Sequence, residues 1–326
     1  MHKIALIGAG RIGQIHARNA ALHPNIDLRL IVDPSTQAAA DVATKWGGKA
    51  TSIEEALKSD DIDGVIIASA THTHLDFMLR AAEAGKTIFC EKPVDQDLRR
   101  AREAEQKLAG ARILMGFNRR FDPHFMALKT AIDSGDVGQV ETLQIISNDP
   151  APPPIDYIAV SGGLFKDMAI HDFDMARWLM NEEPSEIYAA GSCLVDPRIA
   201  EANDIDTART LLKFPSGRLC VISNSRRSGF GYDQRVEAFA SKGMIHVDNI
   251  KETSVRTWTE SGDKGDRFQN FFLDRYASAY KNEMDHFAEM LGGGPPRITY
   301  ADGVAALALA EAASQSLQSS APVALR

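Results

Sequence analysis

A short glycine-rich segment near the amino terminus places the strongest constraint on the fold. The apolar run Lys3–Ile7 is followed at once by Gly8-Ala9-Gly10-Arg11-Ile12-Gly13, which opens an amphipathic segment. This G-x-G-x-x-G pattern is weak alone, but between a strand and a helix it lets the backbone approach a pyrophosphate. Asp33 lies 20 residues beyond Gly13, where a carboxylate binds ribose hydroxyls. Together these features predict a dinucleotide-binding βαβ unit.

The same alternation continues over the first 120 residues. Short β-branched apolar runs alternate with amphipathic patterns, as expected for parallel strands that helices cover on both faces. The expected strands are Lys3–Ile7, Leu28–Val32, Gly64–Ala68, Thr87–Cys90 and Arg112–Phe117, and the expected helices include Ile12–Leu22, Thr36–Lys45, His74–Ala84 and Asp97–Leu108. We predict that residues 1–120 form an α/β Rossmann domain with a doubly wound parallel sheet that binds NAD.

After residue 120 the pattern changes to strands that follow one another without helices between them. The first expected elements are a helix at about His124–Asp133, a strand at Glu141–Ser147, a proline-rich loop at 150–154 and a helix at Asp167–Met180. The later strands are Ile187–Gly191, Thr207–Phe214, Arg218–Ser225, Gln234–Ala240, Met244–Asp248 and Ser254–Thr259, and the final helices are Tyr276–Leu291 and Asp302–Leu317. We predict that residues 121–326 form an α+β domain for substrate binding and oligomerisation, with a large open, mostly antiparallel sheet.

Composition restricts the partners. The length of 326 residues suits two domains, and the net charge of −8 argues weakly against a nucleic-acid partner. No apolar run approaches the ~18 residues of a membrane helix, and the first is too short for a signal peptide. Three separated cysteines, Cys90, Cys193 and Cys220, suggest neither a disulfide framework nor a zinc site. We expect a cytoplasmic protein without a nucleic-acid or membrane partner.

Asp33 also bears on the choice between NAD and NADP. Its carboxylate would repel a 2′-phosphate, and the next residue is Pro34 rather than an arginine that pairs with one. Ser35 could still accommodate a phosphate, so the strictness of this choice stays open. The sequence favours NAD.

Two further groups of residues are suited to moving a proton. Lys92, within Glu91-Lys92-Pro93, follows the Thr87–Cys90 strand at the edge where open α/β sheets bind ligands, and a proline there can stabilise a cis bond. Asp167 and His171 are four residues apart, so on a helix the carboxylate can position the imidazole as a general base. The alternatives are an exposed lysine in a turn and a helix-starting aspartate favoured by the helix dipole.

The histidines provide little support for a metal site. His72 and His74 lie close together, but zinc needs three or four convergent ligands and no H-E-x-x-H pattern is present. We expect no metal. His74 is expected to begin a helix near the cofactor, with Thr71, Glu91 and Lys92 as further cofactor contacts.

The ordered set of motifs resembles a known family. The chain resembles the glucose–fructose oxidoreductase / inositol dehydrogenase / rhizopine-catabolism family over nearly its whole length. The motifs that carry the resemblance are the Gly8–Gly13 segment, Glu91-Lys92-Pro93, the junction Asn118–Asp122 and the run from Gly162 to His171. Within that family, the segments 149–154 and 161–174 look most like bacterial inositol 2-dehydrogenases.

The resemblance implies an enzyme that uses NAD to oxidise a secondary alcohol on a cyclic polyol, such as myo-inositol to 2-keto-myo-inositol. By position, Lys92 would bond the reacting hydroxyl or relay its proton, Asp167 would hold Lys92 and the substrate, and His171 would be the general base. The family also suggests a homo-oligomer, a tetramer, with the polyol bound where the two domains meet. Weaker candidates for polyol contacts are Arg119, Arg120, Asp149, Tyr157 and Tyr232.

One departure from the family and two alternative functions stay open. Related inositol enzymes often carry arginine where this chain has Asn148, which affects the fit of a polyol rather than the chemistry. Another inositol isomer, an aldose or a sugar acid is an alternative substrate. A non-catalytic NAD-sensing regulator is the alternative from a different class, and the presence of Lys92, Asp167 and His171 together argues against it.

Overall fold

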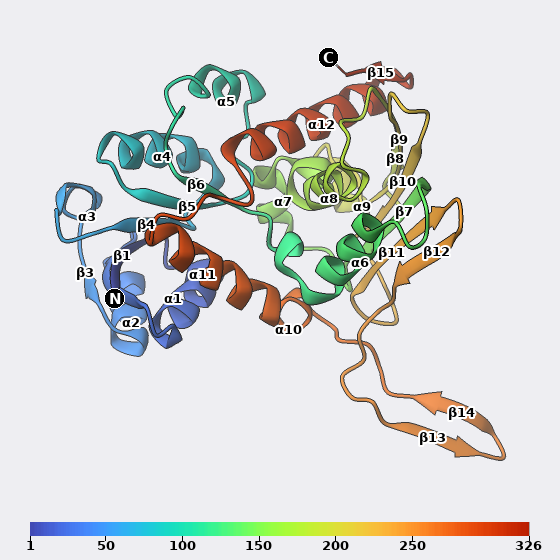
Figure 1. Cartoon of the computed structure of the whole chain (residues 1–326), viewed down its shortest axis with the longest axis horizontal. Coiled ribbons are helices and arrows are strands. Elements are labelled where there is room, and N and C mark those ends of the chain that lie inside the picture. Colours follow the sequence, from blue (N-terminus) through green and yellow to red (C-terminus); the bar gives the residue numbers. More distant parts are fainter. Residues whose placement is uncertain (326) are drawn as a thin grey trace. The chain divides into compact units, whose positions relative to one another are not determined.

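The computed structural model describes residues 1–325, which form two compact units (Figure 1). The first unit combines Met1–Phe121 with Ser278–Ala308, and the second combines Asp122–Ala277 with the chain from Leu309 onward. The sequence assigns both final helices to the second domain. In the structure, α11 (Ala277–Leu291) and the first part of α12 (Tyr300–Ser319) pack in the first unit instead. Amphipathic periodicity reveals a buried helix face but does not identify the sheet that the face covers.

The first unit is built on a six-stranded parallel sheet with the order β3-β2-β1-β4-β5-β6. This is the doubly wound arrangement, so the predicted fold class of the amino-terminal part is confirmed. The strands are β1 (His2–Ile7), β2 (Ile26–Val32), β3 (Lys49–Ala50), β4 (Gly64–Ile67), β5 (Thr87–Glu91) and β6 (Ile113–Gly116). The strand order reverses between β1 and β4, and ligands of such sheets bind at the carboxyl ends of the strands near this point.

Helices cover both faces of the parallel sheet. The helices α1 (Arg11–Leu22), α2 (Thr36–Trp46) and α11 lie on one face, and α4 (His74–Glu83) and α5 (Leu98–Ala104) lie on the other (Figure 1). A short α3 (Ile53–Lys58) and 3₁₀ turns at Thr71–Thr73 and Asn118–Phe121 complete the unit. The expected helix Asp97–Leu108 is shorter in the structure, because α5 ends at Ala104 and turns follow it up to Gly110, which has a φ of +83°.

The second unit is built on a seven-stranded sheet with the order β12-β11-β7-β10-β9-β8-β15. Its strands are β7 (Val140–Asn148), β8 (Glu186–Ser192), β9 (Thr207–Lys213), β10 (Leu219–Ser225), β11 (Asp233–Ala240), β12 (Gly243–Val247) and β15 (Val323–Ala324). Only β7 and β10 pair in parallel, so the prediction of a mostly antiparallel sheet is confirmed. The expected strand Ser254–Thr259 does not join this sheet. It forms β13 (Arg256–Thr259), which pairs only with β14 (Gly262–Gly265) in a hairpin that extends from the unit (Figure 1).

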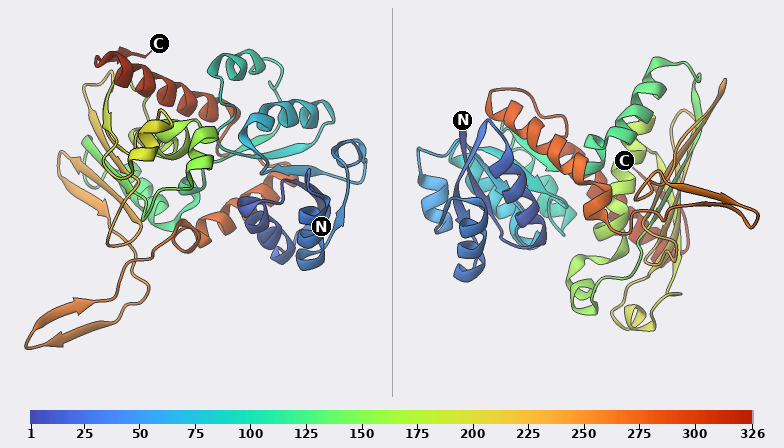
Figure 2. Two further views of the ribbon diagram at one scale, coloured as in Figure 1. Left: turned by 180° about the vertical axis from the view of Figure 1, so that it is seen from behind. Right: turned by 90° about the horizontal axis from the view of Figure 1, so that it is seen from below.

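Helices cover one face of the seven-stranded sheet (Figure 2, right). They are α6 (Pro123–Ser134), α7 (Ile155–Ser161), α8 (Ile170–Met180) and the second part of α12, with a π-helical turn at Phe165–Ala169 before α8. The sequence indicated neither α7 nor the short α9 (Pro197–Glu201) and α10 (Phe272–Arg275). The opposite sheet face exposes a row of large apolar side chains, namely Tyr188, Leu211, Leu219, Val221, Phe239 and Met244.

A buried ion pair fixes the start of the second unit. Asp122 caps α6 by accepting hydrogen bonds from the backbone N–H groups of His124 at 3.1 Å and Phe125 at 3.2 Å. The guanidinium of Arg275 donates to both Asp122 oxygens, at 2.5 and 3.3 Å, and each side chain of the pair is 1% exposed. Because neither charge reaches water, each depends on the other for solvation.

Replacement of Arg275 by methionine should therefore leave the Asp122 carboxylate buried without its cation. We expect Arg275→Met to lower the free energy of unfolding by ~3–5 kcal/mol in urea titrations followed by circular dichroism. The control is Arg256→Met, which removes an ion pair between half-exposed side chains on the hairpin and should change stability by less than ~1 kcal/mol. Equal losses in the two variants would contradict this prediction.

Candidate functional site

Each of the three glycines of the Gly8–Gly13 loop is required for a different structural reason. Gly8 has a φ of +107°, and a Cβ there would lie 2.4 Å from the Ala68 carbonyl oxygen. A Cβ on Gly13 would lie 1.9 Å from the Gly8 carbonyl oxygen, so Gly13 lets α1 pack closely on the end of β1, whereas Gly8 lets the loop pack on the chain that follows β4. A Cβ on Gly10 would meet no atom within 4 Å. Gly10 thus borders open space, as required where a backbone lies close to a pyrophosphate.

The start of α1 suits an anion. Gly10 is the N-cap residue and supplies no capping side chain, and the first turn of α1 contains no acidic residue. The positive end of the helix dipole therefore lies beside the open space at Gly10. These residues fit the pyrophosphate of a dinucleotide.

Asp33 follows β2 and is tied to the glycine loop. Its Oδ2 accepts a hydrogen bond from the Ala9 N–H at 2.8 Å, and its Oδ1 accepts one from the Ser35 N–H at 2.8 Å. The Ser35 hydroxyl, considered above as a phosphate contact, caps α2 by accepting from the Ala38 N–H at 3.2 Å. A fixed carboxylate at the end of β2 matches a ribose with a free 2′-hydroxyl and therefore NAD.

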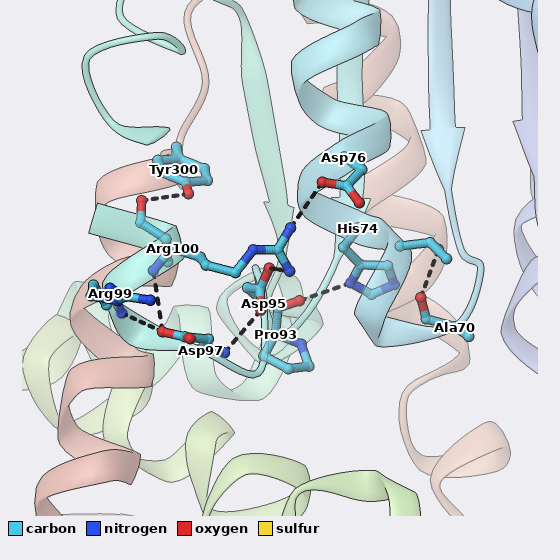
Figure 3. A network of polar contacts seen from close by, with 11 residues as sticks. Ala70, His74, Asp76, Pro93, Asp95, Asp97, Arg99, Arg100 and Tyr300 are labelled. Carbon is cyan, nitrogen blue, oxygen red and sulfur yellow. Dashed lines mark hydrogen bonds and ion pairs between the residues drawn. The ribbon is translucent and has the colours of Figure 1, made fainter. Parts of the chain in front are cut away.

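The Glu91-Lys92-Pro93 turn lies at the carboxyl end of β5, and its Lys92–Pro93 peptide bond is cis. His74, which begins α4 and is 2% exposed, contacts the Pro93 carbonyl through Nδ1 at 2.8 Å and the Ser69 carbonyl through Nε2 at 3.1 Å (Figure 3). Burial lowers the pKa of His74 because it disfavours the imidazolium, although both carbonyl contacts act in the opposite sense. His74 thus connects the chain after β4 with the Lys92 turn.

The segment after Pro93 is held by charged groups on the same side of the sheet (Figure 3). Asp95 is 2% exposed and forms an ion pair of 3.1 Å with Arg100, which also binds Asp76 at 2.9 Å. The hydroxyl of Tyr300 donates to the Ala101 carbonyl at 2.8 Å, so the start of α12 is tied to α5. These contacts give the turn that carries Lys92 a rigid base.

Asp167 lies in the π-helical turn Phe165–Ala169 of the second unit, and His171 lies at the beginning of α8. The expected α-helical spacing between them is therefore replaced by a wider turn, a feature that often occurs at functional positions. The Tyr157 hydroxyl donates to Asp167 Oδ1 at 2.9 Å. Both terminal nitrogens of Arg226 lie 3.3 Å from Asp167 Oδ2.

Arg226 is a residue that the sequence did not indicate. It lies directly after β10, its side chain is 1% exposed, and it also approaches Asp204 Oδ2 at 3.7 Å. Because 59 residues separate it from Asp167, no local pattern predicts the pair. Its buried guanidinium fixes the Asp167 carboxylate by charge and by geometry.

The weaker polyol candidates occupy varied surroundings. In the first unit, Arg119 is buried and Arg120 forms an ion pair of 3.1 Å with Asp302. In the second unit, the Asp149 N–H donates to the Ser225 carbonyl at 2.8 Å, whereas Tyr157 is 47% exposed. Tyr232 is 8% exposed and packs edge-on against Tyr276, with 6.0 Å between the ring centroids. Their contacts with a substrate stay predictions.

Asn148, the departure from the family pattern, belongs to a polar network. Its side-chain amide donates to Asp233 Oδ2 at 3.0 Å. Burial opposes the ionisation of Asp233, but hydrogen bonds from Arg235, Asn249 and Asn148 together hold the pKa of that carboxyl below its usual range. The amide therefore stabilises a buried charge at the start of β11.

Residues 1–325 contain neither a membrane-crossing helix nor a metal-binding cluster. No helix of this part of the chain has both the length and the apolar composition to cross a membrane. Within the same residues, no cluster of three or more histidine, cysteine, aspartate or glutamate side chains has an arrangement that would hold a metal ion.

The class of protein is a dinucleotide-dependent oxidoreductase. It is defined by the doubly wound sheet, the glycine loop that opens α1 and the fixed aspartate after β2. Residues 2–115 match the oxidoreductase family with an NAD-binding Rossmann fold, and residues 125–246 match the GFO/IDH/MocA C-terminal domain. The chain belongs to this GFO/IDH/MocA family of oxidoreductases, so the predicted family and the predicted NAD cofactor are confirmed.

Similar proteins cover the chain almost completely. A myo-inositol 2-dehydrogenase of Thermotoga maritima is 45% identical over 97% of this chain and 96% of its own length. The crystal structure of a myo-inositol dehydrogenase from Corynebacterium glutamicum has a TM-score of 0.96 and 44% identity, with 100% of this chain and 99% of that chain covered. A scyllo-inositol dehydrogenase of Lactobacillus casei, solved with NAD(H) and scyllo-inositol, has a TM-score of 0.93 and 27% identity, and covers 99% of each chain.

The different roles of Gly10 and Gly13 are testable by one substitution each. In Gly10→Ala, where φ is −69° and the new Cβ has free space, we expect stability within ~1 kcal/mol of wild type but roughly tenfold or weaker NAD binding. In Gly13→Ala, the clash with a backbone oxygen should cost about 3 kcal/mol of stability. Urea unfolding and titration calorimetry with NAD measure the two effects. Unchanged NAD affinity in Gly10→Ala would exclude a pyrophosphate at this loop.

Proposed function

We propose that the chain is an NAD-dependent inositol 2-dehydrogenase that oxidises myo-inositol to 2-keto-myo-inositol. The observation that carries the proposal is the glycine loop with its fixed Asp33, in a chain that matches a myo-inositol 2-dehydrogenase over 97% of its residues. The dinucleotide loop supplies the cofactor half of such a reaction. Lys92, Asp167 and His171 supply groups for its proton-transfer half.

The oxidation removes a hydride from carbon and a proton from the hydroxyl oxygen. The Gly8–Gly13 loop and Asp33 would hold NAD, which would supply the hydride acceptor. We assign the proton to the His171 imidazole as general base, while the Lys92 ammonium bonds the hydroxyl oxygen or relays its proton. Asp167 orients the substrate, and the hydrogen bonds from Tyr157 and Arg226 hold its carboxylate in one position. Each remaining ring hydroxyl needs a polar partner, for which Arg119, Arg120, Asp149, Tyr157 and Tyr232 are the candidates.

A second candidate substrate is scyllo-inositol, because a similar protein was solved with that isomer and NAD(H). Aldoses and sugar acids are further alternatives, and a non-catalytic NAD sensor is the alternative outside enzymes. A panel of myo-inositol, scyllo-inositol and glucose, each assayed with NAD and NADP, tests them. The highest kcat/KM should be with myo-inositol and NAD. If no compound of a broad polyol and sugar panel reduces either cofactor, the enzyme proposal is refuted and the non-catalytic NAD sensor is the remaining alternative.

Loss of either proton-handling group should slow the reaction without loss of the cofactor. We expect Lys92→Met and His171→Ala each to lower kcat by ~10²–10⁴-fold, while NAD still binds in titration calorimetry. The exposed residues Lys107 and His246 provide the matched controls Lys107→Met and His246→Ala, which should turn over like wild type. Turnover close to wild type in Lys92→Met or His171→Ala would refute the role of that residue.

We also propose that the protein is a homo-oligomer, a tetramer, in the cytoplasm. The support is the open face of the seven-stranded sheet, where Tyr188 pairs with Leu211 and Leu211 pairs with Val221 across three adjacent strands. These side chains are 39%, 39% and 40% exposed. A continuous apolar face of this kind usually packs on a partner, and a second copy is the simplest one.

A charge placed in this face should dissociate the assembly. We expect Val221→Lys to convert the oligomer to a smaller species in sedimentation velocity at micromolar concentration, because assembly would bury the ammonium. Leu22→Lys, at a residue of α1 that is 68% exposed, is the control and should keep the wild-type mass. An unchanged mass for Val221→Lys would place the interface elsewhere.

A further inference from the structure

A buried group of titratable side chains lies behind the Lys92 turn and has no part in the proposed reaction. It consists of His16 from α1, Glu91 from the end of β5 and Glu283 from α11, all in the first unit. His16 and Glu283 are 0% exposed, and the Glu91 side chain is 12% exposed. Buried ionisable groups are costly, so their presence in a core calls for a physical reason.

The packing of β5 and α11 places these groups together. Side chains alternate along a strand, so Phe89 and Glu91 point to the same face of the sheet. The Phe89 ring packs on His16 and on Phe287 of α11, with centroids 4.7 and 5.7 Å apart. Tyr280, one turn before Glu283 on α11, has its ring centroid 5.9 Å from that of His16. Glu283 therefore lies on the helix face that covers His16 and the end of β5.

His16 holds the Glu91 carboxylate on this inner side of the sheet. The His16 Nε2 lies 2.7 Å from Glu91 Oε1. Gly116 of β6 pairs with Glu91, and a Cβ on Gly116 would lie 3.0 Å from Glu91 Oε2. Glu91 is thus enclosed by α1 and β6, whereas His74 holds the Pro93 carbonyl from α4. The residues on both sides of Lys92 are each bonded to a buried histidine.

Burial disfavours the charged form of Glu283. Neither of its oxygens has a hydrogen-bond partner within residues 1–325. Burial, and secondly the charge of Glu91, raise the pKa of Glu283 well above its usual value. The same two causes raise the pKa of the neighbouring Cys90 thiol. Glu91 is therefore the one carboxylate of this group that the imidazole of His16 binds.

We propose that His16 is a positioning residue: its bond to Glu91, covered by the Glu283 carboxyl, fixes the direction of Lys92. The same helix that begins at the dinucleotide loop then also holds the lysine turn. This inference rests on the catalytic role proposed for Lys92. It predicts that loss of the His16 donor affects Lys92 and kcat far more than the affinity for NAD.

The test compares His16→Leu, which removes the donor, with His16→Gln, which keeps an N–H at similar reach. We expect His16→Leu to lower kcat at least tenfold with the dissociation constant of NAD changed less than threefold, and His16→Gln to recover most of the loss. The control is His23→Leu, at the end of α1, which should keep the wild-type kcat. Equal kcat losses in His16→Leu and His16→Gln, or none in either, would overturn the proposal.

A second readout separates positioning from a general structural effect. An amine-reactive reagent modifies Lys92 at a rate that peptide mass spectrometry can measure. With NAD bound, this rate should change in His16→Leu but not in His16→Gln. An unchanged rate in His16→Leu would overturn the proposal. This readout needs no turnover. A wild-type protein that oxidises no polyol would refute the proposed function, whereas a changed Lys92 rate in His16→Leu would still support the inference.

The raised pKa of Glu283 has its own test in the pH dependence of stability. The folded protein keeps the Glu283 proton above the unfolded pKa of 4.5, whereas the unfolded chain loses it, so this group makes stability fall as pH rises above that value. The titratable groups that face it are Glu91 of β5, His16 of α1 and Tyr280 of α11. Glu283→Gln cannot titrate and should show a shallower fall of unfolding temperature with pH than wild type. Parallel pH profiles would contradict a raised pKa of Glu283 in the folded protein.

Discussion

The close contact between α1 and β1 is the constraint on which the first unit depends. It exists because Gly13 lacks a side chain, since a Cβ there would lie 1.9 Å from the Gly8 carbonyl oxygen. The contact brings the amino end of α1 to the carboxyl edge of the sheet, where the helix dipole suits a pyrophosphate. It also sets the depth of His16, which reaches Glu91 from the second turn of the same helix. The close packing of α1 on β1 thus positions both the cofactor loop and the turn that carries Lys92.

Buried charges in this chain occur where a functional segment must be held, and each has a specific partner. Arg226 and Arg275 are both 1% exposed, and they bind Asp167 and Asp122 respectively. A buried ion pair rarely adds net stability, because desolvation offsets the attraction between its charges. Its geometric effect is more certain, since a guanidinium fork permits few orientations of a carboxylate. Positioning accounts for these pairs better than stability does.

The sequence was sufficient for those parts of the fold that local patterns determine. The apolar runs identify β1, β2, β4, β5 and β6, and the glycine spacing identifies the cofactor loop, because both depend on residues close together in the chain. The position of Lys92 follows from the end of β5 for the same reason. The pairing of β13 with β14 outside the large sheet was not predictable, since an alternating pattern does not specify the neighbouring strand.

The same limit applies to the candidate site. Arg226 meets Asp167 across 59 residues, and Glu283 meets Glu91 only because α11 returns to the first unit. The π-helical turn at Asp167 was also missed, because the spacing of Asp167 and His171 is compatible with an ordinary helix. Sequence motifs therefore located the groups that we propose to perform the chemistry. The groups that orient them became visible only when the chain was folded.

The groups that support Lys92 and Asp167 are separate from the network of Asn148, the position proposed to affect the fit of a polyol. Lys92 and Asp167 are supported by buried groups that make no demand on the shape of a polyol, namely Glu91 with His16 and Arg226 with Asp204. Asn148 instead bonds Asp233, whose other partners, Arg235 and Asn249, lie within the same polar network. A substitution at Asn148 would redistribute hydrogen bonds in that network and leave the support of Lys92 and Asp167 in place. We therefore expect substitutions at Asn148 to act on the proposed polyol site while the proposed proton-transfer groups keep their supports.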